Sequence, residues 1–286
     1  MDAVMAAKLF NRPLVGTIHV YFAESGYLRW FKYKLAVKLV DKAVRRFLNF
    51  MFNQCDLVLA PSKMLVEELN KDGFKKPVSY LPNGVSLTPP KPLSNKAKTL
   101  LKKKYGLKTK VVLHFGRLSH EKNVDVLLKS FQLLTKKHQD VSLLIIGDGP
   151  SKSKLVQLAK KLGIGKEVVF TGFMEHQTLI SSGILSLGDI FATASTMENN
   201  PMAVLEAMMF GLPIVGVKQA GLIELISSNG FLVKPGDTKE MAEKQEKILF
   251  DEKLSTQMRE KSLKLIKPYS VDKVIDKLLE LYRTLK

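Results

Sequence analysis

Two glutamates eight positions apart, Glu198 and Glu206, are the residues whose type and spacing say most about chemistry. They flank the start of a predicted helix, because Pro201 suits the first helical turn, where its missing N–H would be unpaired anyway. A helix N-terminus carries exposed N–H groups and partial positive charge, which favour a phosphate. Carboxylates on both sides of such a turn can accept hydrogen bonds from hydroxyls. Phosphate and hydroxyls together indicate a nucleotide-sugar; the alternative is a solvated loop glutamate and a helix-surface glutamate.

A second run with chemical potential follows the predicted strand 111–115 and begins at Gly116. Glycine there lets a ligand approach the backbone closely. Arg117 can bind a phosphate through two parallel hydrogen bonds, and Lys122 can add a point charge. Both cations follow the carboxyl end of a strand, where open α/β sheets bind ligands. Taken alone the run could be a turn with exposed charges, but together with the two glutamates it indicates a diphosphate site.

Short apolar runs alternate with helical patterns almost throughout the chain. Most runs are unbroken, which is typical of parallel strands buried on both faces. The alternation predicts an α/β fold of the doubly wound kind. The predicted strands are 14–19, 57–60, 78–81, 111–115, 142–146, 168–171, 190–194, 213–217 and 231–233.

The proline-rich and then lysine-rich stretch 89–109 is interpreted as a linker between two domains. Residues 110–267 hold six predicted strands, enough for a complete Rossmann-like domain, whereas residues 1–88 hold about three. Three parallel strands make a poor independent core. We therefore expect an incomplete N-terminal domain; the alternative is a genuinely small lobe.

Composition bounds the class of protein. The 286 residues, of which 45% are hydrophobic, suffice for two compact domains. No apolar run approaches the roughly 20 residues needed to span a bilayer, and the first residues lack the pattern of a secretory signal. Cys55 is the single cysteine, which excludes intrachain disulfides and cysteine-rich metal sites; its apolar surroundings predict a packed thiol. A cytoplasmic setting fits.

The formal net charge of +18 favours an anionic partner: a nucleic acid, an anionic membrane surface or a phosphorylated substrate. Charge alone cannot separate these. No helix-turn-helix signal, zinc-ligand spacing or aromatic RNA-binding motif supports a nucleic acid, so we expect none as a partner.

The motifs resemble those of the retaining GT-B glycosyltransferases of family four. The family's Gly-Arg-x-x-x-x-Lys-Asn motif is matched from Gly116 to Asn123, and its Glu-x7-Glu motif by Glu198 and Glu206. The resemblance covers essentially the whole chain and extends to the family's diacylglycerol glycosyltransferases and phosphatidylinositol mannosyltransferases. It implies two Rossmann-like domains, the first lacking roughly a hundred residues, and a C-terminal helix, 268–286, that packs back on the N-terminal domain.

The resemblance also implies a hexosyltransferase whose donor substrate is a nucleotide diphosphate sugar, with no cofactor and no metal. Arg117 and Lys122 would neutralise the diphosphate, and Glu206 would hold the ribose hydroxyls. Glu198 would contact the sugar, as would His19 from the first domain, although a lone histidine is more often structural. The implied catalytic set is His19, Arg117, Lys122 and Glu198. The implied donor-binding residues are Gly116, Arg117, Lys122, Gly147, Phe173, Met174, Asn199, Asn200, Met202, Ala203 and Glu206.

Residues 28–52 form a basic amphipathic pattern that bears on the acceptor. The cations at helical spacing are Lys34, Lys38, Lys42 and Arg46, and the apolar stripe is Tyr33, Val37, Val40, Val44, Phe47, Leu48 and Met51. Such a helix can lie on an anionic membrane, at roughly 1 kcal/mol per cation, or can face a core with one side solvated.

Because residues 17–24 and the helix after them also resemble diacylglycerol glycosyltransferases, we expect a lipid acceptor. The expected location is cytoplasmic and peripheral on the inner face of the cell membrane. The alternatives are a glycan or polysaccharide-precursor acceptor, or a nucleotide-sugar-binding fragment without transfer activity.

Overall fold

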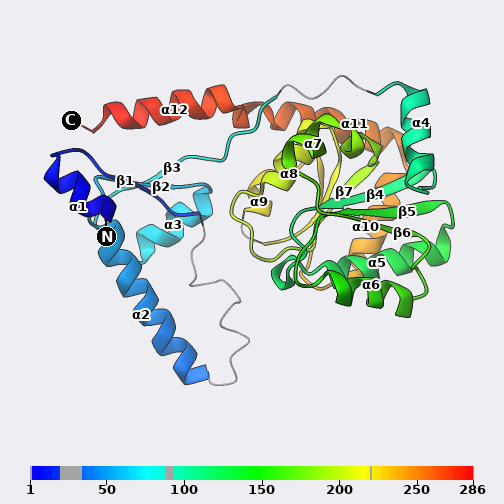
Figure 1. Cartoon of the computed structure of the whole chain (residues 1–286), viewed down its shortest axis with the longest axis horizontal. Helices are drawn as coiled ribbons and strands as arrows, with labels where there is room; N and C mark the ends of the chain where they lie inside the picture. The colour runs from blue at the N-terminus through cyan, green and yellow to red at the C-terminus, as the bar shows by residue number, and fades with distance from the viewer. Residues whose placement is uncertain (1, 20–33, 88–92, 220, 286) are drawn as a thin grey trace. The chain divides into compact units, whose positions relative to one another are not determined.

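The computed structural model describes residues 2–19, 34–87, 93–219 and 221–285. The chain folds as two compact units (Figure 1). Unit 1 comprises Met1–Gly84 and Val271–Lys286, and unit 2 comprises Val85–Ser270.

Unit 1 is built on a small parallel sheet in the order β1-β2-β3. The strands are β1 (Val15–Thr17), β2 (Leu57–Ala60) and β3 (Val78–Tyr80), and the helices are α1 (Asp2–Leu9), α2 (Lys34–Phe52), α3 (Lys63–Lys71) and α12 (Val271–Arg283). Only the central strand β2 is buried along its whole length. Cys55 lies in the core as predicted, and burial raises the pKa of its thiol.

The apolar residues of α2 differ in burial, which the sequence pattern did not show. Leu48 packs against the core of unit 1, while Val40, Phe47 and Phe50 are exposed. The pattern's first part, residues 28–33, lies outside the described residues. Within the described ranges, no helix, α2 included, is both long enough and apolar enough to cross a membrane.

Unit 2 contains a six-stranded parallel sheet in the order β6-β5-β4-β7-β8-β9. The strands are β4 (Lys110–Phe115), β5 (Val141–Ile146), β6 (Val168–Gly172), β7 (Ile190–Ala192), β8 (Ile214–Val217) and β9 (Gly230–Val233). Chain order reverses between β4 and β7, which makes this a doubly wound sheet with its switch point there. The α/β prediction is confirmed, and each of the nine predicted strands is present.

Helices cover both faces of this sheet, with α5 and α6 below it and α7, α8 and α11 above it in Figure 1. They are α4 (Asn95–Lys104), α5 (Val124–Lys137), α6 (Lys152–Lys161), α7 (His176–Ser181), α8 (Met202–Met209), α9 (Leu222–Leu225), α10 (Thr238–Phe250) and α11 (Glu252–Leu265). Short 3-10 turns are η2 (His120–Lys122), η3 (Ile184–Leu187) and η4 (Lys267–Tyr269). Phe131 of α5 and Phe191 of β7 are among the largest side chains fully buried in the core of unit 2.

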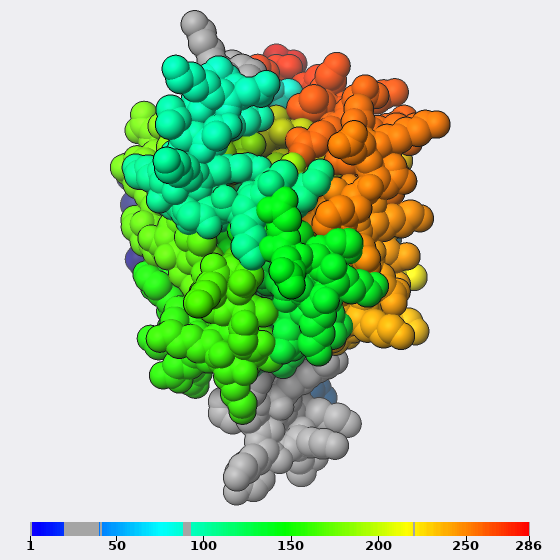
Figure 2. All heavy atoms as spheres, turned by 90° about the vertical axis from the view of Figure 1, so that its right-hand side faces the viewer, coloured from blue at the N-terminus to red at the C-terminus, as the bar shows by residue number. Residues whose placement is uncertain are grey.

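The interpretation of residues 89–109 as a linker is wrong for most of its length, because α4 lies within it. Ser94 caps this helix by accepting a hydrogen bond from the Ala97 N–H at 3.2 Å. Leu101 and Tyr105 pack against the core of unit 2, and Figure 2 shows α4 (teal) resting on that unit. Lysines in its last turn suit the negative end of the helix dipole. Residues 88–92 lie outside the described residues.

His114 is a titratable side chain held inside the core of unit 2. Its ring is 2% exposed, Nδ1 lies 2.9 Å from the carbonyl oxygen of Ala192, and the ring stacks on Phe191. Nε2 has no hydrogen-bond partner among the described residues. Burial, which disfavours the charged imidazolium, lowers the pKa of His114 to about 4. The ring is therefore neutral near pH 7, with Nδ1–H donating to Ala192.

Acidification should destabilise unit 2 through this residue. The unfolded chain protonates His114 near its ordinary value of 6.5, whereas the folded chain resists protonation down to about pH 4. The contribution of neutral His114 to the free energy of unfolding is thus fully present above pH 6.5. It decreases by about 2 to 3 kcal/mol as the pH falls towards 4. In His114→Phe, which keeps a ring against Phe191, this loss should be absent. Chemical denaturation of both proteins at pH 7 and pH 4.5 checks this; equal acid sensitivity would contradict it.

Candidate functional site

A cavity of about 530 Å³ lies in unit 2, at the carboxyl ends of β4, β5 and β6. Ligand sites typically measure about 300–1,000 Å³, and open parallel sheets bind ligands at this end, beside the switch point. The lining residues are Phe115, Gly116, Arg117, Ile146, Gly147, Asp148, Phe173, Met174, His176, Leu179, Met202, Ala203 and Glu206.

Two glycines bring the loops after β4 and β5 together. A Cβ on Gly147 would lie 2.0 Å from the carbonyl oxygen of Gly116, and the φ of +140° also favours glycine there. A Cβ on Gly116 would meet nothing within 4 Å. Position 147 therefore needs glycine for packing, while Gly116 leaves its backbone open to a ligand.

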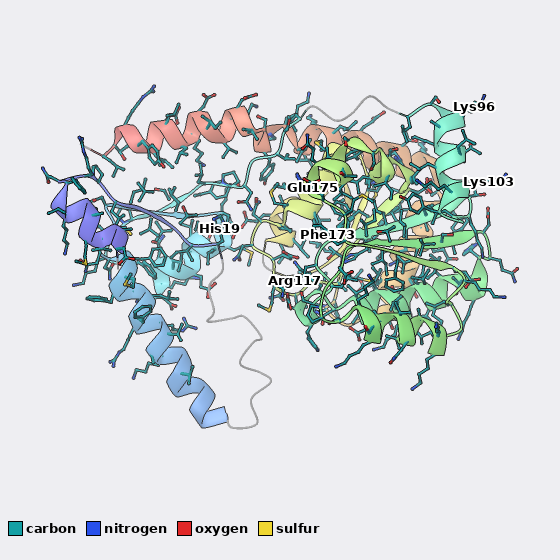
Figure 3. The ribbon with its side chains drawn as sticks, in the orientation of Figure 1. His19, Lys96, Lys103, Arg117, Phe173 and Glu175 are labelled. Carbon is teal, nitrogen blue, oxygen red and sulfur yellow. The ribbon has the colours of Figure 1, made fainter. Side chains whose placement is uncertain are left out.

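Among the described residues that line the cavity, Arg117 is the one lysine or arginine. Asp148 also lines it, but Lys152 Nζ lies 2.6 Å from its Oδ2, and this hydrogen bond is the main cause that lowers the pKa of the Asp148 carboxyl. Phe173 stands at the rim with 78% of its surface exposed. Figure 3 shows Arg117 and Phe173 on the same side of unit 2. The cavity thus combines a cation with an exposed aromatic ring.

Glu206 is a buried carboxylate in the wall of the cavity, on α8 and only 4% exposed. Burial raises the pKa of Glu206, and the hydrogen bond from His176 opposes that rise. The two atoms concerned, His176 Nε2 and Glu206 Oε1, lie 2.7 Å apart. His176 was missed by the sequence analysis. Its place at the first turn after the carboxyl end of β6 is the signal that could have found it.

Lys122 and Glu198, which follow β4 and β7, form an ion pair with Lys122 Nζ 2.5 Å from Glu198 Oε1. The next residue, Asn123, donates from Nδ2 to the carbonyl oxygen of Ala194 at 3.2 Å and to Thr196 Oγ1 at 3.1 Å. Lys122 and Asn123 follow β4, and their three partners follow β7. These contacts tie the two motif loops to each other.

The structure brings most of the predicted donor-binding residues together. Those that line the cavity are Gly116, Arg117, Gly147, Phe173, Met174, Met202, Ala203 and Glu206. Lys122 and Glu198 do not line the cavity and form an ion pair with each other. Asn199 and Asn200 lie in the loop before α8 and do not line the cavity. His19 follows β1 in unit 1, so it is not among the residues that unit 2 assembles.

The helix after Glu198 begins slightly later than predicted. Pro201 is the N-cap of α8, with φ −69° and ψ 121°, and not a residue of the first turn. Its extended ψ places it just before the helix. Glu198 and Glu206 still lie in the loop and on the helix, as predicted from their spacing.

Comparison with known proteins identifies both parts of the chain. Residues 97–265 match the family model of glycosyl transferases group 1, and residues 1–88 match that of Glycosyltransferase Family 4. Alpha-D-kanosaminyltransferase of Streptomyces kanamyceticus is 33% identical over 187 residues, which are 64% of this chain and 48% of that protein. Alpha-monoglucosyldiacylglycerol synthase of Streptococcus pneumoniae is 27% identical over 234 residues, which are 80% of this chain and 51% of that protein.

Among solved structures, the chain is similar to Anabaena Alr3699/HepE, crystallised with UDP, at a TM-score of 0.82 and 23% identity. That match covers 99% of this chain and 75% of the other. It shows the GT-B fold, as the motifs predicted.

The chain spans about half the length of the curated relatives that it matches. The group 1 match covers more than half of this chain and includes both motif loops of the candidate site. The resemblance inferred from the motifs is thereby confirmed, and the chain belongs to the group 1 glycosyl transferases.

Proposed function

We propose that this protein is a retaining hexosyltransferase that moves a hexose from a nucleotide diphosphate sugar to the hydroxyl of a membrane lipid. The observation that carries the proposal is the cavity of unit 2, where Arg117 and the buried Glu206 line one space. A cation and a carboxylate in one cavity suit a ligand that presents both phosphates and hydroxyls. Support also comes from Anabaena HepE, which was crystallised with UDP and with UDP-glucose.

The donor would lie along the cavity with its charged and apolar parts against matching groups. Arg117 pairs with the diphosphate, and the N-terminal N–H groups of α8, at Met202 and Ala203, add partial positive charge. The exposed ring of Phe173 borders the base. Glu206 accepts hydrogen bonds from the ribose hydroxyls.

In the reaction, Arg117 and the N–H groups at the start of α8 stabilise the leaving diphosphate. As the bond from the anomeric carbon to the phosphate oxygen breaks, negative charge grows on that oxygen, and preorganised cations and N–H groups stabilise it. The acceptor oxygen bonds to the same face of the sugar, and its proton passes to the departing diphosphate. Lys122, whose Nζ lies 2.5 Å from Glu198 Oε1, orients this carboxylate towards the sugar hydroxyls.

The lipid acceptor is supported by the exposed face of α2. Val40, Phe47 and Phe50 are exposed on this helix, and Lys42 and Arg46 are exposed beside them. Apolar side chains interleaved with cations suit the boundary between anionic head groups and acyl chains. Relatives in Streptococcus pneumoniae and Acholeplasma laidlawii are named alpha-monoglucosyldiacylglycerol synthases.

Titration calorimetry with UDP, GDP and ADP tests the donor site. We expect saturable binding of one of the three nucleotides. Arg117→Ala should weaken it at least about tenfold, because a charge-assisted contact with the diphosphate is lost. Lys154→Ala, which removes an exposed cation of α6 that does not line the cavity, is the matched control and should leave the affinity unchanged. Equal weakening by both substitutions would point to bulk charge, and absence of binding to any nucleotide would overturn the proposal.

Vesicle co-sedimentation tests the lipid surface. The protein should sediment with phosphatidylglycerol-rich vesicles and remain in solution with phosphatidylcholine alone. The double substitution Lys42→Glu, Arg46→Glu should reduce partitioning at least about tenfold, since each cation near an anionic surface contributes roughly 1 kcal/mol. Lys253→Glu, Lys261→Glu on α11 reverses the same number of exposed charges and serves as control. If the control pair matters as much as the α2 pair, α2 is not the docking element.

A further inference from the structure

The residue that reaches the buried Glu206 is a histidine outside both motifs. His176 is the first residue of α7, and its Nε2 lies 2.7 Å from Glu206 Oε1. The two side chains differ sharply in environment, at 68% exposed for His176 and 5% for Glu206. Within the described residues, His176 is the hydrogen-bond partner of this carboxylate. The two side chains line the same cavity, and the exposed ring occupies one oxygen of the buried carboxylate.

Glu206 needs such a partner for physical reasons. A carboxylate out of water favours its neutral, protonated form, and burial does raise the pKa of Glu206. The other charged side chains that line the cavity are Arg117 and Asp148, and Asp148 is paired with Lys152. Glu175 precedes His176 at the start of α7. Among these side chains, His176 is the one that forms a hydrogen bond with Glu206.

We propose that His176 is a positioning residue for recognition of the nucleoside hydroxyls. Its Nε2–H donates to Oε1 of Glu206, which fixes the carboxylate plane and leaves Oε2 to accept a hydrogen bond from a ribose hydroxyl. The inference rests on the proposed function, because it takes the ligand of the cavity to be a nucleoside diphosphate. A histidine that only held α7 in place would affect every ligand of the cavity alike.

Calorimetry with a nucleotide and its 2′-deoxy form separates these two roles. The probes are UDP and 2′-deoxy-UDP, or the corresponding GDP or ADP pair if one of those binds instead. The wild type should prefer the ribose form. His176→Ala should lose about tenfold in affinity for the ribose form, since the buried carboxylate loses a charge-assisted partner. Its affinity for the 2′-deoxy form should hardly change, so the preference should largely vanish.

The side-chain amide in His176→Gln keeps an N–H donor, so this variant should retain most of the preference. Gln177→Ala, the adjacent exposed position on α7, is the matched control and should resemble the wild type. In the Glu206→Ala background, removing His176 should have no further effect on the preference. His176→Leu replaces His176→Ala if the latter does not fold.

The outcomes are distinguishable. Equal loss of both nucleotide forms in His176→Ala, or an undiminished preference for the ribose form, overturns the role of His176 while leaving the donor site in place. Failure of the wild type to bind UDP, GDP or ADP overturns the proposed function itself, and this inference with it.

Discussion

The hydrogen bonds between the loop after β4 and the loop after β7 are the contacts on which the site depends. Asn123, in the left-handed conformation at φ 47°, donates to Ala194 and Thr196 across the switch point. Beside it, Lys122 pairs with Glu198. The parallel sheet brings the carboxyl ends of both strands to one edge, but side-chain contacts must hold the loops there. With the loops tied, the start of α8 has a defined place relative to Arg117.

The second constraint is the handling of charge in and around the cavity. The chain is strongly basic. Even so, the hydrogen-bond partner of the buried carboxylate Glu206 is a largely exposed histidine and not a lysine or arginine. Asp148 is likewise paired, with Lys152. Arg117 therefore faces a cavity in which the acidic groups already have partners, and it is left to attract an anionic ligand. A phosphate would meet this cation together with the start of α8.

Much of the fold could be predicted because buried parallel strands leave a local signature. Unbroken apolar runs such as 143–146 are typical of strands buried on both faces of a layered sheet. The packing of two helices could not be predicted from the sequence, for a common reason. The lysines of α4 suggested a linker, although Leu101 and Tyr105 anchor it to unit 2. The apolar stripe of α2 left a membrane surface and a protein core as alternatives, and in the structure Leu48 packs against the core while Phe47 is exposed. The residue composition of a helix does not determine which other elements pack against it.

The sequence by itself determined the elements, the parallel sheets and the motif residues, because backbone geometry and strand burial depend on residues close together in the chain. It also predicted that Arg117 and Glu206 would serve one ligand, from the resemblance of the motifs. Only the tertiary structure decided that Lys122 pairs with Glu198, and that Glu206 pairs with His176, which is separated from it by 30 positions. Such pairings depend on how loops from different strands converge, and no local pattern encodes that convergence.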